Sequence, residues 1–358
     1  MKVALVYDRV NKFGGAERFF KNILDIFPDA PIYTLVSDLK KSNWVNNHKV
    51  IPTFFNKIKY LRTRHELLAP LASLAFETHD LSAYDLVISL TSADAKSVIT
   101  HPHQTHICIC LTPTRYLWDE KKHYRQDIKI KVLPQFIFNY FRFVDNLFSN
   151  RPDFYIAISK EVQNRILKNY QKNSVVIYPP VDSKFFVRTP QKTSSRKYFL
   201  VVSRLVQYKK VDLVIKTFNR LNQKLIVVGE GHDLKKLQNI AHKNISFVGQ
   251  VTDEQLKKYY QSAKAVIFPQ KEDFGLVPLE AQASGTPVIA YKKGGALETI
   301  IDGQTGLFFS FQKPSSLSKA LKKFSQTKFN YQNCIRNARQ FSTQEFKQKL
   351  IDFIKQVV

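Results

Sequence analysis

The sequence predicts an α/β protein made of two Rossmann-like, doubly wound domains that face a cleft. Short apolar runs alternate with helical patterns along most of the chain, which is the rhythm of βαβ units. A second series of such runs begins after the proline-containing connector at 178–182. The length of 358 residues is more than twice that of an average domain of roughly 150 residues, so two domains are expected.

The first apolar run, Val3–Tyr7, is typical of a buried parallel strand. The segment Gly14-Gly15-Ala16-Glu17 follows it and precedes a helical pattern that ends at Pro28. Cys108 and Cys110 alternate with apolar residues, so we interpret them as one face of a buried strand and not as a redox pair. Further strands of this domain are expected at 32–36, 86–90, 105–110 and 154–158.

The second series of apolar runs predicts a second sheet. Its strands are expected at 198–203, 225–229, 245–249, 265–268 and 287–290, with helices at 212–221 and 234–241. We therefore predict an N-terminal domain at 1–180 and a C-terminal domain at 181–338. Apolar residues recur at helical spacing between Phe346 and Val357, so 339–358 is expected to contain a terminal amphipathic helix.

The chain is strongly basic, with 55 basic and 29 acidic residues and a formal net charge of +26. Residues 1–180 hold 25 basic and 16 acidic residues, and residues 181–358 hold 30 and 13, so the excess is +9 and +17. Nucleic acid, an anionic membrane surface and phosphorylated substrates are the anionic partners that such a charge serves. A generally basic surface without any such partner is the alternative.

Two segments combine basic and aromatic residues. Residues 49–64 include five basic residues, no acidic residue and the aromatic side chains of Phe54 and Tyr60. Residues 121–151 include seven basic residues, two acidic residues and the aromatic stretch 136–141. Arg142 and Asp145 follow this stretch closely, so it cannot span a bilayer. It fits either a helix in the plane of a membrane interface or a core helix with a cationic solvent face.

Targeting signals are largely missing from the sequence. The apolar run at the N-terminus ends at Tyr7, which is too short for the core of a signal peptide. No uninterrupted apolar run reaches the ~18 residues of a spanning helix. Three cysteines form an odd and sparse set that fits a reducing compartment. We therefore expect a cytoplasmic protein, bound peripherally to the inner face of the membrane.

The segment from Glu272 to Glu280 carries the densest chemical signal. Phe274-Gly275-Leu276 is expected to turn the chain and open a helix, whose free N–H groups attract an anion. Glu272 then stands before this helix and Glu280 lies within it, so that one carboxylate can bind sugar hydroxyls and the other a ribose. Glutamate pairs at this spacing are mostly solvated, but the glycine turn and the flanking strands favour a functional site.

Arg204 and Lys209 follow the first strand expected in the C-terminal domain. An arginine at the end of a strand and a lysine at the next helix start can together neutralise a diphosphate. Alone, these residues would more often be two surface cations of a basic chain. Their combination with the Glu272–Glu280 segment favours a phosphate site.

Other common motifs are absent from the sequence. Gly14-Gly15 is not part of a GxGxxG motif, and Gly229-Glu230-Gly231 does not continue as a dinucleotide fingerprint. There is no phosphate-binding P-loop, no HExxH and no GxSxG. The lack of an Asp-x-Asp cluster disfavours a site for Mg²⁺ or Mn²⁺.

The order and spacing of these segments resemble a retaining glycosyltransferase of the GT-B fold, in the large group called family 4 or glycosyl transferases group 1. The resemblance covers nearly the whole chain. The segment 112–119 is most similar to O-antigen and exopolysaccharide mannosyltransferases. The other matching segments are 14–17, 203–209, 247–253, 272–280 and 285–290, with weaker matches at 158–160 and 178–182.

The resemblance implies a role for each matching residue. It implies that Glu272 contacts the donor sugar, that Glu280 holds the ribose, and that Arg204 and Lys209 hold the diphosphate. Gly15 and the backbone of Phe274, Gly275 and Leu276 would approach the phosphates and sugar, and the backbone of Val251 would meet the base. The terminal helix would cross back onto the N-terminal domain.

The resemblance also implies the chemistry. It implies a metal-independent hexosyltransferase that needs no cofactor and takes a nucleotide-sugar as donor substrate, with GDP-mannose favoured and a UDP-sugar as the alternative. The acceptor would be a lipid-linked or free saccharide in cell-surface polysaccharide synthesis. Retention of configuration would follow from attack on the same face, with the leaving phosphate as base.

One position departs from the family pattern. Related sequences commonly carry a histidine directly before the Thr-Pro pair, where this chain has Leu111. A catalytically degenerate scaffold that still binds a nucleotide-sugar is therefore one alternative. A basic nucleic-acid-binding protein is the other, although no known nucleic-acid motif is present.

Overall fold

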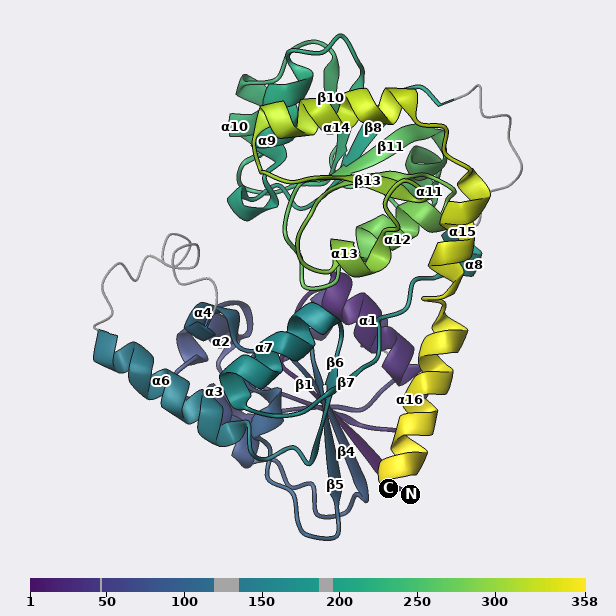
Figure 1. Ribbon diagram of the computed structural model, residues 1–358. Coiled ribbons are helices and arrows are strands. Elements are labelled where there is room, and N and C mark those ends of the chain that lie inside the picture. The colour runs from purple at the N-terminus through teal and green to yellow at the C-terminus, as the bar shows by residue number, and fades with distance from the viewer. Residues whose placement is uncertain (46, 119–134, 187–195) are drawn as a thin grey trace. The chain divides into compact units, whose positions relative to one another are not determined.

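The computed structural model describes residues 1–45, 47–118, 135–186 and 196–358 (Figure 1). The chain divides into two compact units. Unit 1 comprises Met1–Tyr178 and Phe346–Val358, and unit 2 comprises Pro179–Glu345. Five of the seven basic residues of the segment 121–151, those from Lys121 to Lys131, lie outside the described residues.

Unit 1 is built on a seven-stranded sheet whose strands are all parallel, in the order β3-β2-β1-β4-β5-β6-β7. Leu5 of β1 pairs with Ile32 on one side and Ile88 on the other, so the chain order reverses at β1. The strands are β1 (Val3–Tyr7), β2 (Ile32–Thr34), β3 (Val50–Pro52), β4 (Leu86–Thr91), β5 (Thr105–Cys110), β6 (Phe154–Ala157) and β7 (Val175–Val176). Ligand sites in such sheets lie at the carboxyl ends of the strands, next to the reversal point.

Helices and short 3₁₀ turns connect these strands. The helix α1 starts at Gly15 because Gly14 is still extended, and its buried side chains include Phe19, Phe20 and Ile23 at helical spacing. The α-helices of unit 1 are α1 (Gly15–Leu24), α2 (Lys59–Thr63), α3 (Ala72–Glu77), α4 (Arg115–Trp118), α6 (Gln135–Phe148), α7 (Lys160–Tyr170) and α16 (Thr343–Val357). Its 3₁₀ turns are η1 (Leu39–Lys41), η2 (Asn43–Val45), η3 (Phe54–Lys57), η4 (His65–Leu68) and η5 (Ala95–Ser97).

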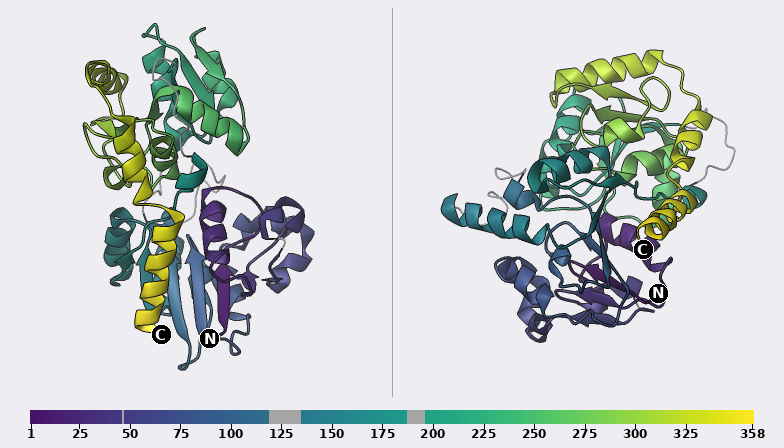
Figure 2. Two further views of the ribbon diagram at one scale, coloured as in Figure 1. Left: turned by 90° about the vertical axis from the view of Figure 1, so that its right-hand side faces the viewer. Right: turned by 60° about the horizontal axis from the view of Figure 1, so that its bottom comes forward.

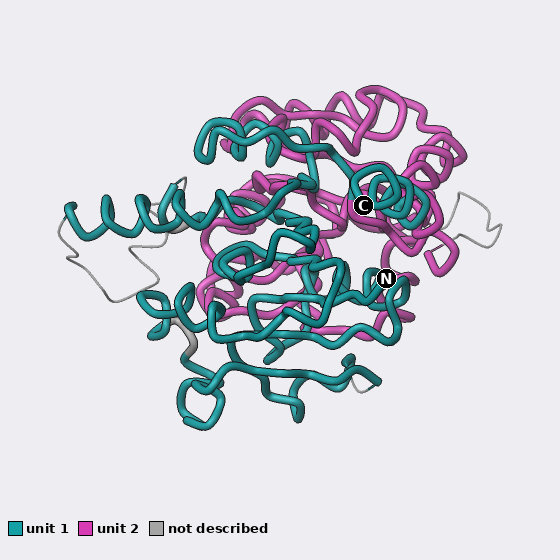
Figure 3. The backbone as a smooth tube through the Cα atoms, turned by 90° about the horizontal axis from the view of Figure 1, so that it is seen from below, with its two compact units in different colours: residues 1–178, 346–358 teal, residues 179–345 magenta. Residues whose placement is uncertain are grey.

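The C-terminal helix α16 packs on unit 1 beside α1 (Figure 2). Its buried side chains are Phe346, Leu350 and Ile354, which repeat every four residues. The Phe346 ring lies 5.2 Å from that of Phe19 on α1. Almost all of this helix therefore belongs to unit 1 although unit 2 precedes it in sequence, as the two colours of Figure 3 show.

Unit 2 is built on a six-stranded parallel sheet in the order β10-β9-β8-β11-β12-β13. Its strands are β8 (Tyr198–Val202), β9 (Leu225–Val228), β10 (Ile245–Phe247), β11 (Ala263–Phe268), β12 (Val288–Tyr291) and β13 (Gly306–Phe309). Its α-helices are α8 (Ser183–Phe186), α9 (Val211–Phe218), α10 (Leu234–Asn239), α11 (Asp253–Ser262), α12 (Leu276–Ala283), α13 (Ala296–Thr299), α14 (Pro314–Gln326) and α15 (Tyr331–Arg339). The 3₁₀ turn η7 (Gln207–Lys209) precedes α9.

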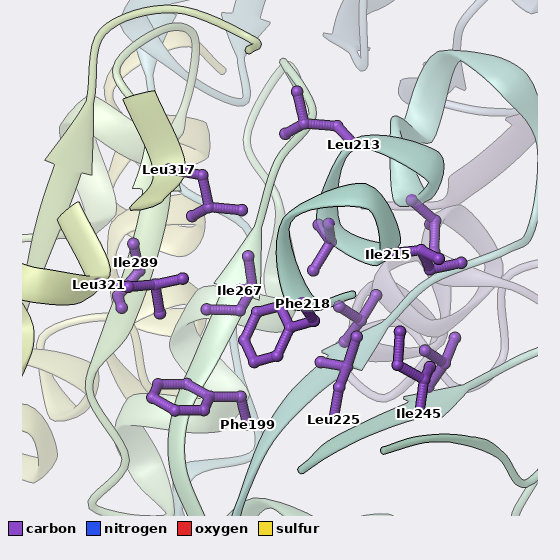
Figure 4. Packing of buried hydrophobic residues seen from close by; sticks show 14 of the residues in the cluster. Phe199, Leu213, Ile215, Phe218, Leu225, Ile245, Ile267, Ile289, Leu317 and Leu321 are labelled. Atoms are coloured by element: carbon purple, nitrogen blue, oxygen red, sulfur yellow. The ribbon is translucent and has the colours of Figure 1, made fainter. Parts of the chain in front are cut away.

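The core of unit 2 is apolar and continuous across its sheet (Figure 4). Phe199 of β8 and Phe218 of α9 are both buried, with ring centroids 5.3 Å apart. Leu317 and Leu321 of α14 join the same cluster of buried side chains. The core holds β8 and β11 rigidly side by side, which fixes the loops that leave their carboxyl ends.

The structure confirms the predicted fold class of two doubly wound, parallel α/β units. The strand at 105–110 has the expected bounds, and Cys108 and Cys110 are buried on it. The strands β3, β7 and β13 were not predicted. They are short, and β3 contains Pro52 while β13 begins at Gly306, both of which weaken a strand pattern.

The aromatic stretch forms part of the helix α6, and its solvent face is not cationic. Phe136, Tyr140 and Phe143 are among its most exposed side chains. Of the two alternatives left open by the sequence, the core helix with a cationic solvent face does not fit these exposed side chains. In the part of the chain that the structure describes, we find no helix that combines the length and apolar character needed to cross a bilayer.

Candidate functional site

Two neighbouring strands of unit 2 deliver the predicted site residues to one edge of the sheet. The strands β8 and β11 are parallel, and Leu200 pairs with Val266. Arg204 follows the end of β8 by two residues, and Glu272 follows the end of β11 by four. Because parallel strands end at the same edge, the loops that carry these residues lie next to each other.

Lys209 and Glu272 form an ion pair at this edge. The Nζ of Lys209 bonds to Oε1 of Glu272, and their side chains are 15% and 16% exposed. Lys209 ends the 3₁₀ turn η7, and its backbone N–H donates to the carbonyl of Val206. The pair joins the segment after β8 to the segment after β11.

Tyr208 links the two predicted cations. The guanidinium of Arg204 donates from Nη2 to the Tyr208 hydroxyl at 2.8 Å. The Nζ of Lys209 lies 5.0 Å from the centre of the Tyr208 ring, within the range of a cation–π contact. Sequence reasoning missed Tyr208, although an aromatic residue between two predicted phosphate-binding cations was the available signal.

The turn at Gly275 opens the helix α12. Gly275 has φ 87°, in the left-handed region that glycine adopts without strain, and a Cβ there would lie 2.9 Å from the Phe268 ring. Leu276 is the first residue of α12, so the backbone N–H groups of its first turn have no partner within the helix. The predicted turn and helix start are confirmed.

Glu272 and Glu280 lie in different environments. Glu272 precedes α12, whereas Glu280 is its fifth residue and is only 7% exposed. One carboxylate oxygen of Glu280 accepts a hydrogen bond from the hydroxyl of the buried Tyr260 at 2.8 Å. Tyr260 belongs to α11, so this contact fixes the carboxylate of Glu280 against a neighbouring helix. The sequence spacing alone did not indicate this contact.

The loop between β12 and α13 packs against the backbone of the Glu272 segment. The N–H of Gly295 donates to the carbonyl of Glu272 at 2.9 Å. A Cβ on Gly295 would lie 2.3 Å from the Cα of Phe274, so no larger residue fits without moving the segment. Sequence reasoning missed this loop, and the Gly294-Gly295 pair shortly after a strand was its signal.

The remaining predicted residues of unit 2 lie on the same series of loops. Val251 lies on the loop between β10 and α11 and is half-buried. The next residue, Thr252, caps α11 through its side chain. Phe274 is buried, with its ring 5.9 Å from that of Phe341. Only the backbone of Phe274 is therefore available for contacts at the start of α12.

Gly15 belongs to unit 1, where it is exposed at the first turn of α1. A Cβ on Gly15 would meet no atom within 4 Å, so the fold itself does not require a glycine there. Glu17 is buried and accepts a hydrogen bond from the Tyr7 hydroxyl at 2.8 Å, which fixes the glycine turn to β1. Leu111 follows β5, and its N–H donates to the carbonyl of Thr91 at 2.8 Å.

Residues 182–341 match the family described as Glycosyl transferases group 1. They form a glycosyltransferase group 1 domain. This domain contains Arg204, Lys209, Val251, Glu272 and Glu280, and it nearly coincides with unit 2.

Curated relatives carry glycosyltransferase names. An uncharacterised glycosyltransferase of Methanocaldococcus jannaschii is 26% identical over 206 residues, which are 51% of this chain and 57% of the relative. The O-antigen chain mannosyltransferase RfbU of Salmonella typhimurium is 29% identical over 52% of this chain and 55% of its own length. The GDP-mannose-dependent alpha-(1-6)-phosphatidylinositol monomannoside mannosyltransferase of Mycolicibacterium smegmatis is 31% identical over 36% of this chain and 38% of its length. The chain thus spans between 18% and 59% of the length of these and further curated relatives.

Solved structures of GT-B proteins share the fold over the whole chain. The lipopolysaccharide outer core galactosyltransferase WaaB superposes with a TM-score of 0.72 at 20% identity and covers 100% of both chains. HepE of Anabaena in complex with UDP has a TM-score of 0.74 at 18% identity, over 99% of this chain and 100% of its own. The structure therefore has the GT-B fold, as the sequence predicted.

The glycosyltransferase domain brings five predicted residues to one sheet edge: Arg204, Lys209, Glu272, Gly275 and Leu276. Glu280 follows on the same helix, and Val251 lies on the loop after β10. Among the residues that the structure describes, no group of three His, Cys, Asp or Glu side chains is placed to hold a metal ion. The predicted charged residues of this domain are the cations Arg204 and Lys209 and the carboxylates Glu272 and Glu280.

Proposed function

We propose that this protein is a retaining hexosyltransferase that moves mannose from GDP-mannose to a lipid-linked or saccharide acceptor. The observation that carries the proposal is the Lys209–Glu272 ion pair at the ends of β8 and β11, within a glycosyltransferase group 1 domain. The pair sets a cation for a phosphate beside a carboxylate for a sugar. That is the order in which these groups occur in a nucleotide-sugar.

Arg204 and Lys209 bind the diphosphate in this proposal. Both are positively charged, both contact Tyr208, and Arg204 is exposed at the end of its strand. An arginine offers two parallel N–H groups to a phosphate, and a lysine offers a mobile point charge. The two cations stabilise the diphosphate as it leaves the sugar, so no metal ion is needed for that charge.

Glu272 and Glu280 bind hydroxyl groups. A carboxylate accepts hydrogen bonds from two adjacent hydroxyls, so Glu272 binds the donor hexose and Glu280 the ribose. The hydroxyl of Tyr260 donates to Oε2 of Glu280 and thereby orients this carboxylate. Lys209 holds Glu272 in place, and a diphosphate that attracts Lys209 frees the carboxylate to bind the sugar.

Backbone groups complete the proposed donor site. The free N–H groups at the start of α12, from Gly275 and Leu276 onward, attract the diphosphate by their partial positive charge. The backbone of Val251 contacts the base. For Gly15 of unit 1 we propose a role of the same kind, since the open space around its Cα allows a phosphate or sugar to approach closely.

The names of the relatives support mannose and GDP. Several curated relatives are called mannosyltransferases, and one of them is called GDP-mannose-dependent. A UDP-sugar is the alternative donor, supported by solved GT-B neighbours in complex with UDP and UDP-glucose. We place the acceptor in cell-surface polysaccharide synthesis at the inner face of the membrane.

The test measures transfer and donor binding with one set of variants. Lys209→Ala and Glu272→Ala should each lower the transfer rate from GDP-mannose by about 10³-fold or more, because each removes a group that acts on the reacting part of the donor. Thermal shift with GDP-mannose, UDP-glucose and ADP-glucose identifies the donor, since a ligand of the folded state raises its melting temperature.

Lys216→Ala is the matched control. Lys216 also pairs with a carboxylate in unit 2, Asp212 at 3.0 Å, but both side chains are exposed. This variant should transfer sugar at the wild-type rate. Unchanged rates in Lys209→Ala and Glu272→Ala would contradict the proposal, and donor binding without any transfer would favour the degenerate scaffold.

A further inference from the structure

The helix α6 exposes an apolar stripe along its whole length. Phe136 is 70% exposed, Tyr140 61%, Phe143 66% and Leu147 54%. These positions follow the i, i+4, i+7, i+11 spacing, so they lie on one side of the helix. Four large apolar side chains on one face are far more than the scattered exposure of single residues that surfaces usually show.

A buried polar network fixes this orientation. Asp145 of α6 is 6% exposed, and its carboxylate pairs with the buried Lys96 at 2.7 Å. The same carboxylate accepts hydrogen bonds from Thr114 at 2.9 Å, Trp118 at 2.6 Å and Tyr170 at 2.9 Å. Turning α6 to bury its aromatic stripe would break all of these bonds. The partners of Asp145 would then stay buried without this hydrogen-bond acceptor.

Further contacts hold the inner side of α6. The Nε of Arg142 donates to the carbonyl of Leu117 at 2.7 Å, and the guanidinium lies 5.2 Å from the Trp118 ring centre. Asn146 donates to the carbonyl of Asn169 at 3.0 Å. The polar side chains of Arg142, Asp145 and Asn146 therefore face the protein, while the stripe of large apolar side chains that begins at Phe136 faces outward.

The charges around this face fit an anionic partner. The one acidic residue of α6 is Asp145, which is buried and paired. In the same unit, the segment that runs from η3 into α2 exposes Phe54, Ile58 and Tyr60. Basic residues surround them, since the segment 49–64 holds five and no acidic residue.

We propose that α6 lies in the interface of an anionic lipid bilayer, with Phe136, Tyr140, Phe143 and Leu147 among the acyl chains. Its 14 residues span about 21 Å, so it lies on the membrane and does not cross it. Apolar burial supplies the attachment, and the basic residues of the segment 49–64 add attraction to anionic headgroups. This inference rests on the proposed function for its biological purpose, namely access to a lipid-linked acceptor.

The test is sedimentation of the full-length protein with lipid vesicles. The variant Phe136→Gln/Tyr140→Gln/Phe143→Gln replaces exposed residues only, with a residue that favours helix, so the fold should persist. On vesicles that contain phosphatidylglycerol, its bound fraction should fall about tenfold relative to the wild type. On pure phosphatidylcholine, the wild type should bind more weakly and lose little on addition of salt.

Leu167→Gln and Phe311→Gln are the matched controls. Leu167 is 55% exposed on α7 and Phe311 is 66% exposed in unit 2, so each change removes a comparable exposed apolar group elsewhere. Both should bind vesicles like the wild type. Equal binding by the α6 variant and the wild type would overturn the inference. A wild type that forms dimers in solution, ignores vesicles and becomes monomeric in the α6 variant would also overturn it.

The outcome is separable from that of the proposed function, because vesicle binding needs no activity. Thermal shift of the α6 variant by GDP-mannose should equal that of the wild type. Lost vesicle binding with intact donor binding supports the membrane face. Vesicle binding that is intact in a protein without any transfer would contradict the proposed function alone.

Discussion

The two units differ in the charged side chains that they bury and in the large apolar side chains that they expose. Among the described residues of unit 2, the buried charged side chains are Asp273 and Glu280, and both lie in the 272–280 segment. Unit 1 buries charged side chains throughout its core: Asp8, Glu17, Lys96 and Asp145. The large apolar side chains exposed in unit 2 are Leu297, Ile301 and Phe311, whereas unit 1 exposes the stripe of α6 and many others.

This difference indicates that polar side chains serve different purposes in the two units. Unit 2 has an ordinary apolar core and concentrates its polar chemistry at one sheet edge, which suits a rigid site for a charged ligand. Unit 1 uses buried polar networks to hold its loops and helices in orientations that an apolar core would not select. Asp8 is the second such centre, since its carboxylate accepts bonds from Thr91 at 2.7 Å and from the N–H groups of Ser92 and Ala95.

The largest expected effect comes from breaking the network of unit 1. Asp145→Ala should lower the free energy of unfolding by about 3–5 kcal/mol, because it leaves the buried Lys96 ammonium without its carboxylate. Urea unfolding measures this loss. The double variant Lys96→Met/Asp145→Leu should lose clearly less, and a double variant as unstable as Asp145→Ala would show that the charge is not the cause.

The next effect tests the support of the site in unit 2. Gly295→Ala should displace the Glu272–Phe274 backbone, since its Cβ would lie 2.3 Å from the Cα of Phe274. A shift of about 1 Å at such a site lowers turnover by about 10²-fold. Steady-state kinetics with GDP-mannose checks this. Gly303→Ala is the control: a Cβ there meets no atom within 4 Å, and its φ of 75° strains an alanine, so this change should cost stability but leave turnover unchanged. Turnover of Gly295→Ala as high as that of Gly303→Ala would show that the loop does not support the site.

The site segments of unit 2 could largely be predicted from the sequence, whereas the buried polar networks of unit 1 could not. The 272–280 segment, the cations after β8 and the helix start at Gly275 are local patterns, so the sequence order reveals them. The hydrogen bonds of Asp145 join residues 25 to 49 positions apart. Contacts at such separations leave no periodic pattern in the sequence, so they could not be predicted from it. The sequence therefore left open whether α6 points its aromatic or its polar side outward.

A smaller effect is expected from acid. Burial lowers the pKa of His79 from 6.5 to about 4. The unfolded chain then binds a proton as the pH falls through 6.5 while the folded protein does not, so stability present above that pH is lost toward pH 4. His79 should account for about 2 kcal/mol of the loss between pH 7.5 and 5.

Urea unfolding at both pH values measures this loss. In His79→Phe, which keeps a ring beside Tyr33, the difference between the two pH values should shrink by that amount. Burial also lowers the pKa of His106 to about 3, so a residual pH dependence should remain. An undiminished difference in His79→Phe would show that His79 does not carry this loss.

The smallest effect concerns the contact between the two cations. Tyr208→Phe removes the hydroxyl that accepts from Arg204 at 2.8 Å but keeps the ring beside Lys209. A neutral acceptor lost from an exposed guanidinium costs about 1 kcal/mol, so KM for the donor should rise roughly fivefold with kcat little changed. A large fall in kcat instead would assign Tyr208 a direct part in the reaction.

The most direct test of the site compares the binding of GDP and guanosine by calorimetry. If Lys209 and Arg204 grip the diphosphate, Lys209→Ala should raise the Kd for GDP at least about tenfold. The Kd for guanosine, which has no phosphate, should stay that of the wild type. Equal affinity of wild type and Lys209→Ala for GDP would contradict the assignment of this sheet edge to a nucleotide-sugar.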